Sequence, residues 1–185
     1  PGAVRIDGAL GQYALLIPDK DMVVVITECT LIDGATQRRL VWNRLLPAVG
    51  DDTLIPGKDY KRLLKKQSSY QLPFVPGKAS SSLARDYAGK SIVLEPNKFD
   101  WQSLDLQFKQ KEVIMTVTET DGTKYNLSFG YKQWKKTSTD VHPPYSIEAK
   151  GRFNGIEGPF YVAGSYAWPS AAMLELKAHY VNWIT

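Results

Sequence analysis

Side chains that could act as nucleophiles are present in this chain, but none stands in the spacing that nucleophilic chemistry needs. The sequence contains no Ser-x-x-Lys motif, which brings a lysine beside a serine, and no Gly-x-Ser-x-Gly motif, which presents a serine on a strained turn. Ser165 comes nearest to the second motif, with Ala163 and Ala167 where the glycines would stand. We therefore expect Ser165 to be an ordinary strand residue and this chain alone to be without catalytic activity.

Metal and cofactor chemistry lacks the residues that it needs. A zinc site takes three or four ligands, whereas the chain has two histidines, His142 and His179, far apart in sequence, and one cysteine, Cys29. Cys29 permits no internal disulfide and is expected to be a small buried residue. The glycine-rich patterns that bind phosphate groups are absent. The sequence therefore predicts no metal and no cofactor.

Carboxylates are numerous, but the sequence does not pair them. Glycosidase chemistry, for example, needs two carboxyl groups about 5–10 Å apart in a cleft. Glu119 falls at the end of a predicted strand, and the sequence identifies no partner for it. The carboxylates therefore predict no catalytic pair.

Aromatic residues gather in the C-terminal half, where two interpretations compete. Interleaved with lysines and arginines, they could stack on nucleic acid or sugar, but the core of a β domain uses the same residues. The net charge of +4 is mild and mixed with acids, apart from the basic segment 58–66, so we favour a core and expect no nucleic-acid partner. The aromatic residues are Trp101, Trp134, Trp168, Trp183, Tyr125, Tyr131, Tyr145, Tyr161, Tyr166 and Tyr180.

A β-hairpin near the N-terminus is the clearest structural signal. Two apolar runs, 13–17 and 22–27, flank the turn sequence Pro-Asp-Lys-Asp at 18–21. Neither run alternates with polar residues, which is typical of strands buried on both faces. A helix predicted over 35–48, capped by Asp33 or Thr36 and ended by Pro47, can cover one face. Because only ten residues precede the hairpin, we expect the chain to be a piece of a larger protein.

The rest of the chain predicts a linker and a β domain. We expect residues 1–50 to form the first part, 51–82 a linker with a short basic helix at 58–67, and 83–185 an antiparallel barrel or sandwich, with the junction near residue 78. Apolar residues alternate with polar ones in several segments, and an Asp-Gly pair at 121–122 marks a tight hairpin. The predicted strands are 87–95, 103–109, 112–119, 124–129, 131–136, 146–154, 159–168 and 172–181.

Three segments resemble a known family. Residues 5–13 (RIDGALGQY), with the hairpin that follows, resemble the C-terminal end of the catalytic domain of bacterial serine hydrolases in the β-lactamase and penicillin-binding-protein-like superfamily. Residues 41–48 (VWNRLLPA) resemble the last helix of that domain. Residues 94–97 (LEPN) resemble the auxiliary β domain, lipocalin-like in architecture, that some members carry after it.

The resemblance implies where an active site would lie. The family's Ser-x-x-Lys and Tyr-x-Asn elements would stand upstream of this chain, and its Lys-Thr-Gly or His-x-Gly element would fall on residues 6–8. Ile6 takes the basic position and Arg5 stands one place earlier, so the basic group is displaced or absent. The residues that would line the substrate cleft are Asp7, Gly8, Ala9, Gly11 and Gln12.

Function and partners follow as expectations. We expect a C-terminal fragment of a serine hydrolase, periplasmic or secreted, whose partner is the missing catalytic portion of the parent chain. A second copy could also pair with the N-terminal hairpin. No apolar run approaches the roughly 20 residues of a membrane span. Alternatively, the β domain is the functional unit and binds a small apolar ligand, a glycan or a protein, or serves only as a structural cover.

Overall fold

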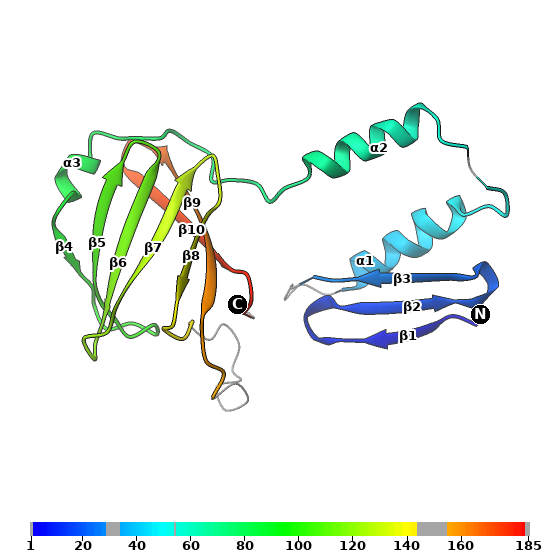
Figure 1. Cartoon of the computed structure of the whole chain (residues 1–185), viewed down its shortest axis with the longest axis horizontal. Coiled ribbons are helices and arrows are strands. Elements are labelled where there is room, and N and C mark those ends of the chain that lie inside the picture. The colour runs from blue at the N-terminus through cyan, green and yellow to red at the C-terminus, as the bar shows by residue number, and fades with distance from the viewer. Residues whose placement is uncertain (1, 29–33, 54, 144–154, 184–185) are drawn as a thin grey trace. The chain divides into compact units, whose positions relative to one another are not determined.

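The protein consists of two compact units, Pro1–Tyr70 and Gln71–Thr185. The computed structural model describes residues 2–28, 34–53, 55–143 and 155–183 (Figure 1). Cys29, Asp33 and the strand predicted at 146–154 lie outside the described residues. Each unit has its own sheet.

The first unit contains a three-stranded antiparallel sheet in the order β1-β2-β3. The predicted hairpin is confirmed as β2 and β3, which pair from Tyr13 opposite Ile26 to Ile17 opposite Met22. Its turn is closed by the Asp21 N–H, which donates to the Pro18 carbonyl at 3.0 Å. The strands are β1 (Val4–Asp7), β2 (Tyr13–Ile17) and β3 (Met22–Ile26).

The predicted helix over 35–48 is also confirmed. It begins as α1 (Ala35–Leu40), continues through a π-helical turn (Val41–Leu45) and ends in a 3₁₀ turn (Leu46–Ala48). Pro47 lies in that last turn, where its ring stops the helical hydrogen-bond pattern. The helix is capped by Gly34 and not by Thr36, because helical geometry already begins at Ala35. A second helix, α2 (Lys58–Ser69), covers the predicted basic segment.

The second unit is built on one seven-stranded sheet in the order β10-β9-β7-β6-β5-β4, with β8 pairing with β9 (Figure 1). All its pairs are antiparallel except β7 with β9, which run parallel where Gly130 faces Ser165 and Tyr131 faces Tyr166. The elements are α3 (Ala84–Tyr87), β4 (Ser91–Val93), β5 (Trp101–Lys109), β6 (Glu112–Glu119), β7 (Lys124–Tyr131), β8 (Lys135–Thr139), β9 (Phe160–Ser170) and β10 (Met173–Tyr180).

The prediction of a closed barrel is wrong, and two predicted strands have other bounds in the structure. The described strands form a mixed sheet that is not closed into a barrel. The strand predicted at 87–95 is found only as the three-residue strand β4, after the end of α3. So short an edge strand offers few backbone groups that could close the sheet onto β10. The strand predicted at 131–136 begins only at Lys135, because Lys132 adopts a left-handed conformation with φ of 53° and turns the chain.

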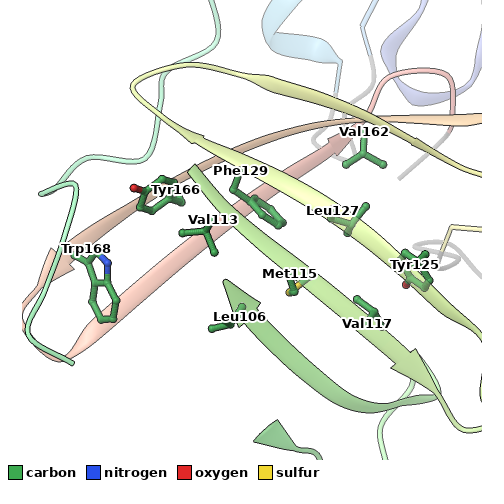
Figure 2. Packing of buried hydrophobic residues seen from close by; sticks show 10 residues of the cluster. All are labelled: Leu106, Val113, Met115, Val117, Tyr125, Leu127, Phe129, Val162, Tyr166 and Trp168. Atoms are coloured by element: carbon green, nitrogen blue, oxygen red, sulfur yellow. The ribbon is translucent and has the colours of Figure 1, made fainter. Parts of the chain in front are cut away.

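The core of the second unit lies on one face of the sheet, the face that carries every second residue of β6 and β7. Val113, Met115 and Val117 of β6 face Phe129, Leu127 and Tyr125 of β7 in register, which confirms the predicted period of two. Figure 2 shows these side chains with the other members of the cluster, Leu106, Val162, Tyr166 and Trp168.

The segment 75–79, called the strap below, precedes α3 and packs against one edge of this core. Lys78 and Trp168 exchange backbone hydrogen bonds of 2.9 Å, and the Tyr166 hydroxyl donates to the Ala79 carbonyl at 3.0 Å. Val75 on the same segment is buried. The strap is therefore part of the second unit and links it to the rest of the chain.

Candidate functional site

A cavity of about 340 Å³ opens on the core side of the seven-stranded sheet. Its walls come from β5, β6, β7 and β10 and from the loop before β5, and they are almost wholly apolar and aromatic. That volume is near the lower end of the range of about 300–1,000 Å³ for small-molecule pockets. The cavity therefore suits a compact ligand. The lining residues are Phe99, Trp101, Leu104, Met115, Leu127, Phe129, Leu176, Ala178 and Tyr180.

Glu119 is not itself a lining residue, but the strand period places it next to the cavity wall. Val113, Met115 and Val117 point into the core, and the same alternation along β6 turns Glu119 to that side. Glu119 pairs in register with Trp101, which lines the cavity. The interior row of β6 thus ends in a carboxyl group.

Two tyrosines accompany the Glu119 carboxyl. Tyr125 hydrogen-bonds to Glu119 and to the side chain of Trp101, and Tyr180 lies close enough to interact electrostatically with both Glu119 and Tyr125. Burial raises the pKa of Tyr180 to about 12, with a smaller contribution from the Glu119 charge. Burial also raises the pKa of Tyr125, and the neighbouring Tyr180 and Glu119 charges add to that rise. Both hydroxyls therefore keep their protons at neutral pH and can donate hydrogen bonds.

The surroundings of Glu119 disfavour its charged form. Burial raises the pKa of the Glu119 carboxyl, and the carboxylates of Asp121 and Asp100 raise it further. The hydrogen bond with Tyr125 acts in the opposite direction. A shifted carboxyl beside an apolar cavity is a common property of binding and catalytic sites, so this end of the cavity is the strongest candidate site in the second unit.

Two turns hold this end of the cavity in place. In the β6–β7 hairpin, the Thr123 N–H donates to Oδ1 of Asp121 at 2.8 Å. In the loop before β5, Nδ2 of Asn97 donates to the Trp101 carbonyl at 2.7 Å. The two turns are joined by a hydrogen bond of 2.8 Å from the Thr120 N–H to the Asp100 carbonyl. These bonds set the positions of the aromatic walls and of the carboxylates.

The residues predicted to line a substrate cleft lie together in the first unit. Asp7 ends β1, and Gly8, Ala9, Gly11 and Gln12 form the connection to β2. The Gly8 N–H donates to the Gln12 carbonyl at 2.8 Å, which closes the connection. Gly11 has a φ of 86°, which favours glycine, and the Glu28 carboxyl occupies the space that a Cβ would need. The structure thus brings the five residues into one tight turn.

Arg5, the displaced basic residue, forms an ion pair with Asp7, with Nε 2.8 Å from Oδ1. It pairs in register with Leu15, which is fully buried. Arg5 also borders a hollow of about 530 Å³ lined by residues of β1 and the helix. The other lining residues are Ala3, Val4, Ala35, Arg38, Arg39 and Trp42.

Ser165 lies in a buried strand, and the two histidines pack against aromatic rings. Ser165 lies within β9 and is fully buried, as expected for a strand residue. The His142 ring packs edge-on against Phe160, and the His179 ring against Trp134. Burial lowers the pKa of His179, and the charge of Lys177 lowers it further. Among the described residues, no three His, Cys, Asp or Glu side chains gather in a way that could bind a metal ion.

Sequence reasoning missed the environment of Glu119. The signal was present in part, because the period of two along 113–119 places Glu119 on the core side. The contribution of Tyr180 could not be seen, since it depends on how β10 lies across the core.

No family model, curated protein or solved structure matches this chain. None of the helices in the described part of the chain has both the length and the apolar character that crossing a membrane requires.

Proposed function

We propose that residues 1–50 are the C-terminal end of the catalytic domain of a bacterial serine hydrolase of the β-lactamase and penicillin-binding-protein-like superfamily. The chain lacks the nucleophile and is inactive alone. The observation that carries this proposal is the three-stranded sheet with a helix across one face and apolar side chains on both faces. The resemblance also favours a periplasmic or secreted location.

The face under the helix is well covered. Leu15 is fully buried and Ile17 nearly so, as is Val41 of the helix. Arg38 lies over the Tyr13 ring, 4.9 Å from its centre, and the Gln37 side chain donates to the Glu28 carboxylate at 2.9 Å. In Figure 1 the helix runs alongside this sheet. The helix therefore covers this face of the sheet.

The opposite face is apolar and open among the described residues of the first unit. Two rows cross the strands in register: Val4–Leu16–Val23 and Ile6–Ala14–Val25. Val23 and Val25 are 62% and 65% exposed. A contiguous apolar patch of this kind is typical of an interaction surface. In this proposal the remaining part of the catalytic domain covers it.

The turn after β1 would then line the substrate cleft. Among the described strands β1 pairs with β2 alone, so the backbone groups on its outer side are available to a substrate. Gly8 and Ala9 admit a close approach, and in the resembling family this strand edge contributes to the oxyanion hole. The Gly8 N–H is already donated to Gln12, so any oxyanion contact would come from a neighbouring N–H group.

An active-site serine probe tests this proposal. A fluorophosphonate should not label the isolated chain, whereas it should label a protein extended upstream in the same reading frame, on the serine of a Ser-x-x-Lys motif. Labelling of the isolated chain, or an upstream frame without that motif, would overturn the proposal. Gly8→Val provides a sharper measurement: it should lower labelling of the extended protein, and Gly57→Val, at an exposed position before α2, serves as the matched control.

A second function is favoured by the cavity of the second unit. We propose that this unit binds a small apolar ligand, because a cavity of about 340 Å³ on the core side of the sheet has almost wholly apolar and aromatic walls. A glycan or a protein partner fits the small, apolar lining less well. In the test, 2-phenylethanol is titrated against the full chain by NMR. Binding should shift resonances of cavity residues, and Ala178→Phe, which fills the cavity, should abolish those shifts.

A further inference from the structure

The hollow between β1 and the helix of the first unit is lined by three arginines and, among the described residues, by no carboxylate. It has a volume of about 530 Å³ and is open to solvent. We propose that this hollow binds a phosphate monoester that carries a small apolar group. The arginines bind the phosphate, and the apolar group lies against Trp42. Neither function proposed above uses this site, so the inference stands apart from both.

Helical spacing brings four of the lining residues onto one face of the helix. Ala35, Arg38, Arg39 and Trp42 occupy positions i, i+3, i+4 and i+7, which share a face. The start of β1 forms the opposite wall of the hollow. Among the described strands β1 pairs with β2 alone, so no further described strand covers this edge. The local helix period and the open edge of the sheet together form the hollow.

Arg38 and Arg39 are held in place by contacts that leave N–H donors free. The Arg38 guanidinium lies over the Tyr13 ring, 4.9 Å from its centre, and this attraction needs no hydrogen bond from the guanidinium. Nη2 of Arg39 donates to Oγ1 of Thr36 at 3.2 Å. A guanidinium carries several N–H donors in one plane, and neither arginine forms an ion pair with a described residue. Neighbouring donors are therefore available to an oxyanion.

The charges around the hollow favour a doubly charged anion. Nε of Arg5 lies 2.8 Å from Oδ1 of Asp7, so this carboxylate offsets one of the three positive charges and two remain. The Glu28 carboxylate accepts a hydrogen bond from the helix and is not a lining residue. A phosphate monoester carries a charge of about −1.5 to −2 at pH 7 and strong acceptor oxygens. Arginine binds such oxygens in pairs, so a phosphate fits better than a carboxylate.

The apolar part of the lining favours a ligand with an apolar group. Trp42 and Val4 are 43% and 56% exposed, and both line the hollow. Inorganic phosphate would leave both side chains in water, whereas an apolar group attached to the phosphate would remove apolar surface from water. A volume of about 530 Å³ lies within the usual range of about 300–1,000 Å³ for small-molecule pockets. It accommodates a phosphate together with an aromatic ring.

Three probes test the inference on the full chain by calorimetry: phenyl phosphate, methyl phosphate and benzoate. Phenyl phosphate should bind most tightly. Methyl phosphate, which lacks the ring, should bind about two- to tenfold more weakly, as expected for the loss of one aromatic contact. Benzoate, which carries a single charge, should bind roughly tenfold more weakly. Equal affinities for phenyl phosphate and benzoate overturn the selection for phosphate, and equal affinities for the two phosphates overturn the apolar part of the site.

Substitutions on one helix separate a specific site from general attraction to positive charge. Arg39→Gln should weaken the binding of phenyl phosphate about tenfold, because it removes charge-assisted hydrogen bonds. Arg44→Gln removes the same charge from the same helix outside the hollow and should change the affinity by no more than about twofold. Trp42→Ala should bring phenyl phosphate down to the affinity of methyl phosphate and leave methyl phosphate unchanged. Equal losses for the two arginine variants would contradict the site.

NMR of the unmodified chain locates the bound probe even if a variant does not fold. Phenyl phosphate should shift the amide resonances of residues 3–5 and 35–42. The basic helix α2 is the competing location, because it carries Lys58, Lys61, Arg62, Lys65 and Lys66. Shifts confined to α2, or no binding of any probe, overturn the inference.

Discussion

The two sheets of this protein use the same residue types with opposite results. Val113 and Val117 of the seven-stranded sheet are 0% exposed, whereas Val23 and Val25 of the three-stranded sheet are 62% and 65% exposed. All four valines lie in regular antiparallel strands with a partner strand in register. Strand propensity therefore does not distinguish them. The difference is whether the unit itself supplies a second layer.

The second unit supplies its own cover, because its sheet curls and apolar rows from β5, β6, β7 and β9 meet on one side. The first unit covers one face with a helix and leaves the other apolar and open. Hydrophobic burial is the main favourable term in folding, so the second sheet gains far more of it per residue. The second unit therefore buries the apolar face of its own sheet, whereas the described residues of the first unit leave one apolar face of theirs open.

The largest expected effect is the loss of a core side chain in the second unit. Phe129 is 1% exposed and lies in the central cluster, so Phe129→Ala should lower the free energy of unfolding by about 3–5 kcal/mol. Urea unfolding followed by tryptophan fluorescence measures it, since Trp101, Trp134, Trp168 and Trp183 all lie in this unit.

Val25→Ala is the matched control on the open face. It should change the free energy of unfolding by no more than about 0.5 kcal/mol, because an exposed side chain loses little on truncation. A cost for Val25→Ala comparable to that for Phe129→Ala would erase the contrast between the two sheets.

A smaller effect is expected at the strap that seals the core. Tyr166→Phe removes the hydroxyl that donates to the Ala79 carbonyl at 3.0 Å and should lower the free energy of unfolding by about 1 kcal/mol. Tyr161→Phe, on the same strand but half exposed, should have almost no effect. Equal losses at both positions would mean that the strap contributes nothing to the second unit.

Glu119 should contribute to the pH dependence of the free energy of unfolding. The pKa of Glu119 is raised in the folded state, so the group stabilises the fold below its unfolded pKa, and that contribution is lost as pH rises through the folded pKa. Glu119→Gln should therefore raise the free energy of unfolding, relative to the unmodified chain, more at about pH 7 than at about pH 3.5. The difference between the two pH values should be less than about 1 kcal/mol. Denaturant titrations at both pH values measure it, and a difference of opposite sign would place Glu119 in a polar environment.

Substitutions to lysine on the open face should have the smallest effect on stability. They should have a clear effect on self-association. We propose that the isolated chain covers this face by pairing with a second copy. Val23→Lys with Val25→Lys should then convert a self-associated chain to a monomer, by light scattering, while the free energy of unfolding changes by no more than about 1 kcal/mol. Leu63→Lys with Leu64→Lys on the exposed α2 is the control. A monomeric unmodified chain at high concentration would contradict the pairing.

Local signals predicted much of the fold. The hairpin, the helix that Pro47 ends, and the strands of 112–119 and 124–129 are found as expected, because turn residues and the period of apolar residues act over a few positions. The closed barrel was wrong because closure depends on the length of the edge strand, and the short β4 follows a helical turn that the sequence did not reveal. The cavity depended on partners far apart in the chain and could not be predicted.

The sequence by itself determined which side chains share a face, since alternation along each strand is a local property. It placed Glu119 on the core side of β6 and placed apolar residues on both faces of the N-terminal hairpin. Only the tertiary structure decided what each face meets. Gly164, for example, lets β9 cross close to β7, where the Ser128 carbonyl occupies the space of a Cβ, and β10 brings Tyr180 to the Glu119 end of the cavity. These contacts join residues far apart in the chain, and their formation depends on the packing of whole strands, which no local pattern encodes.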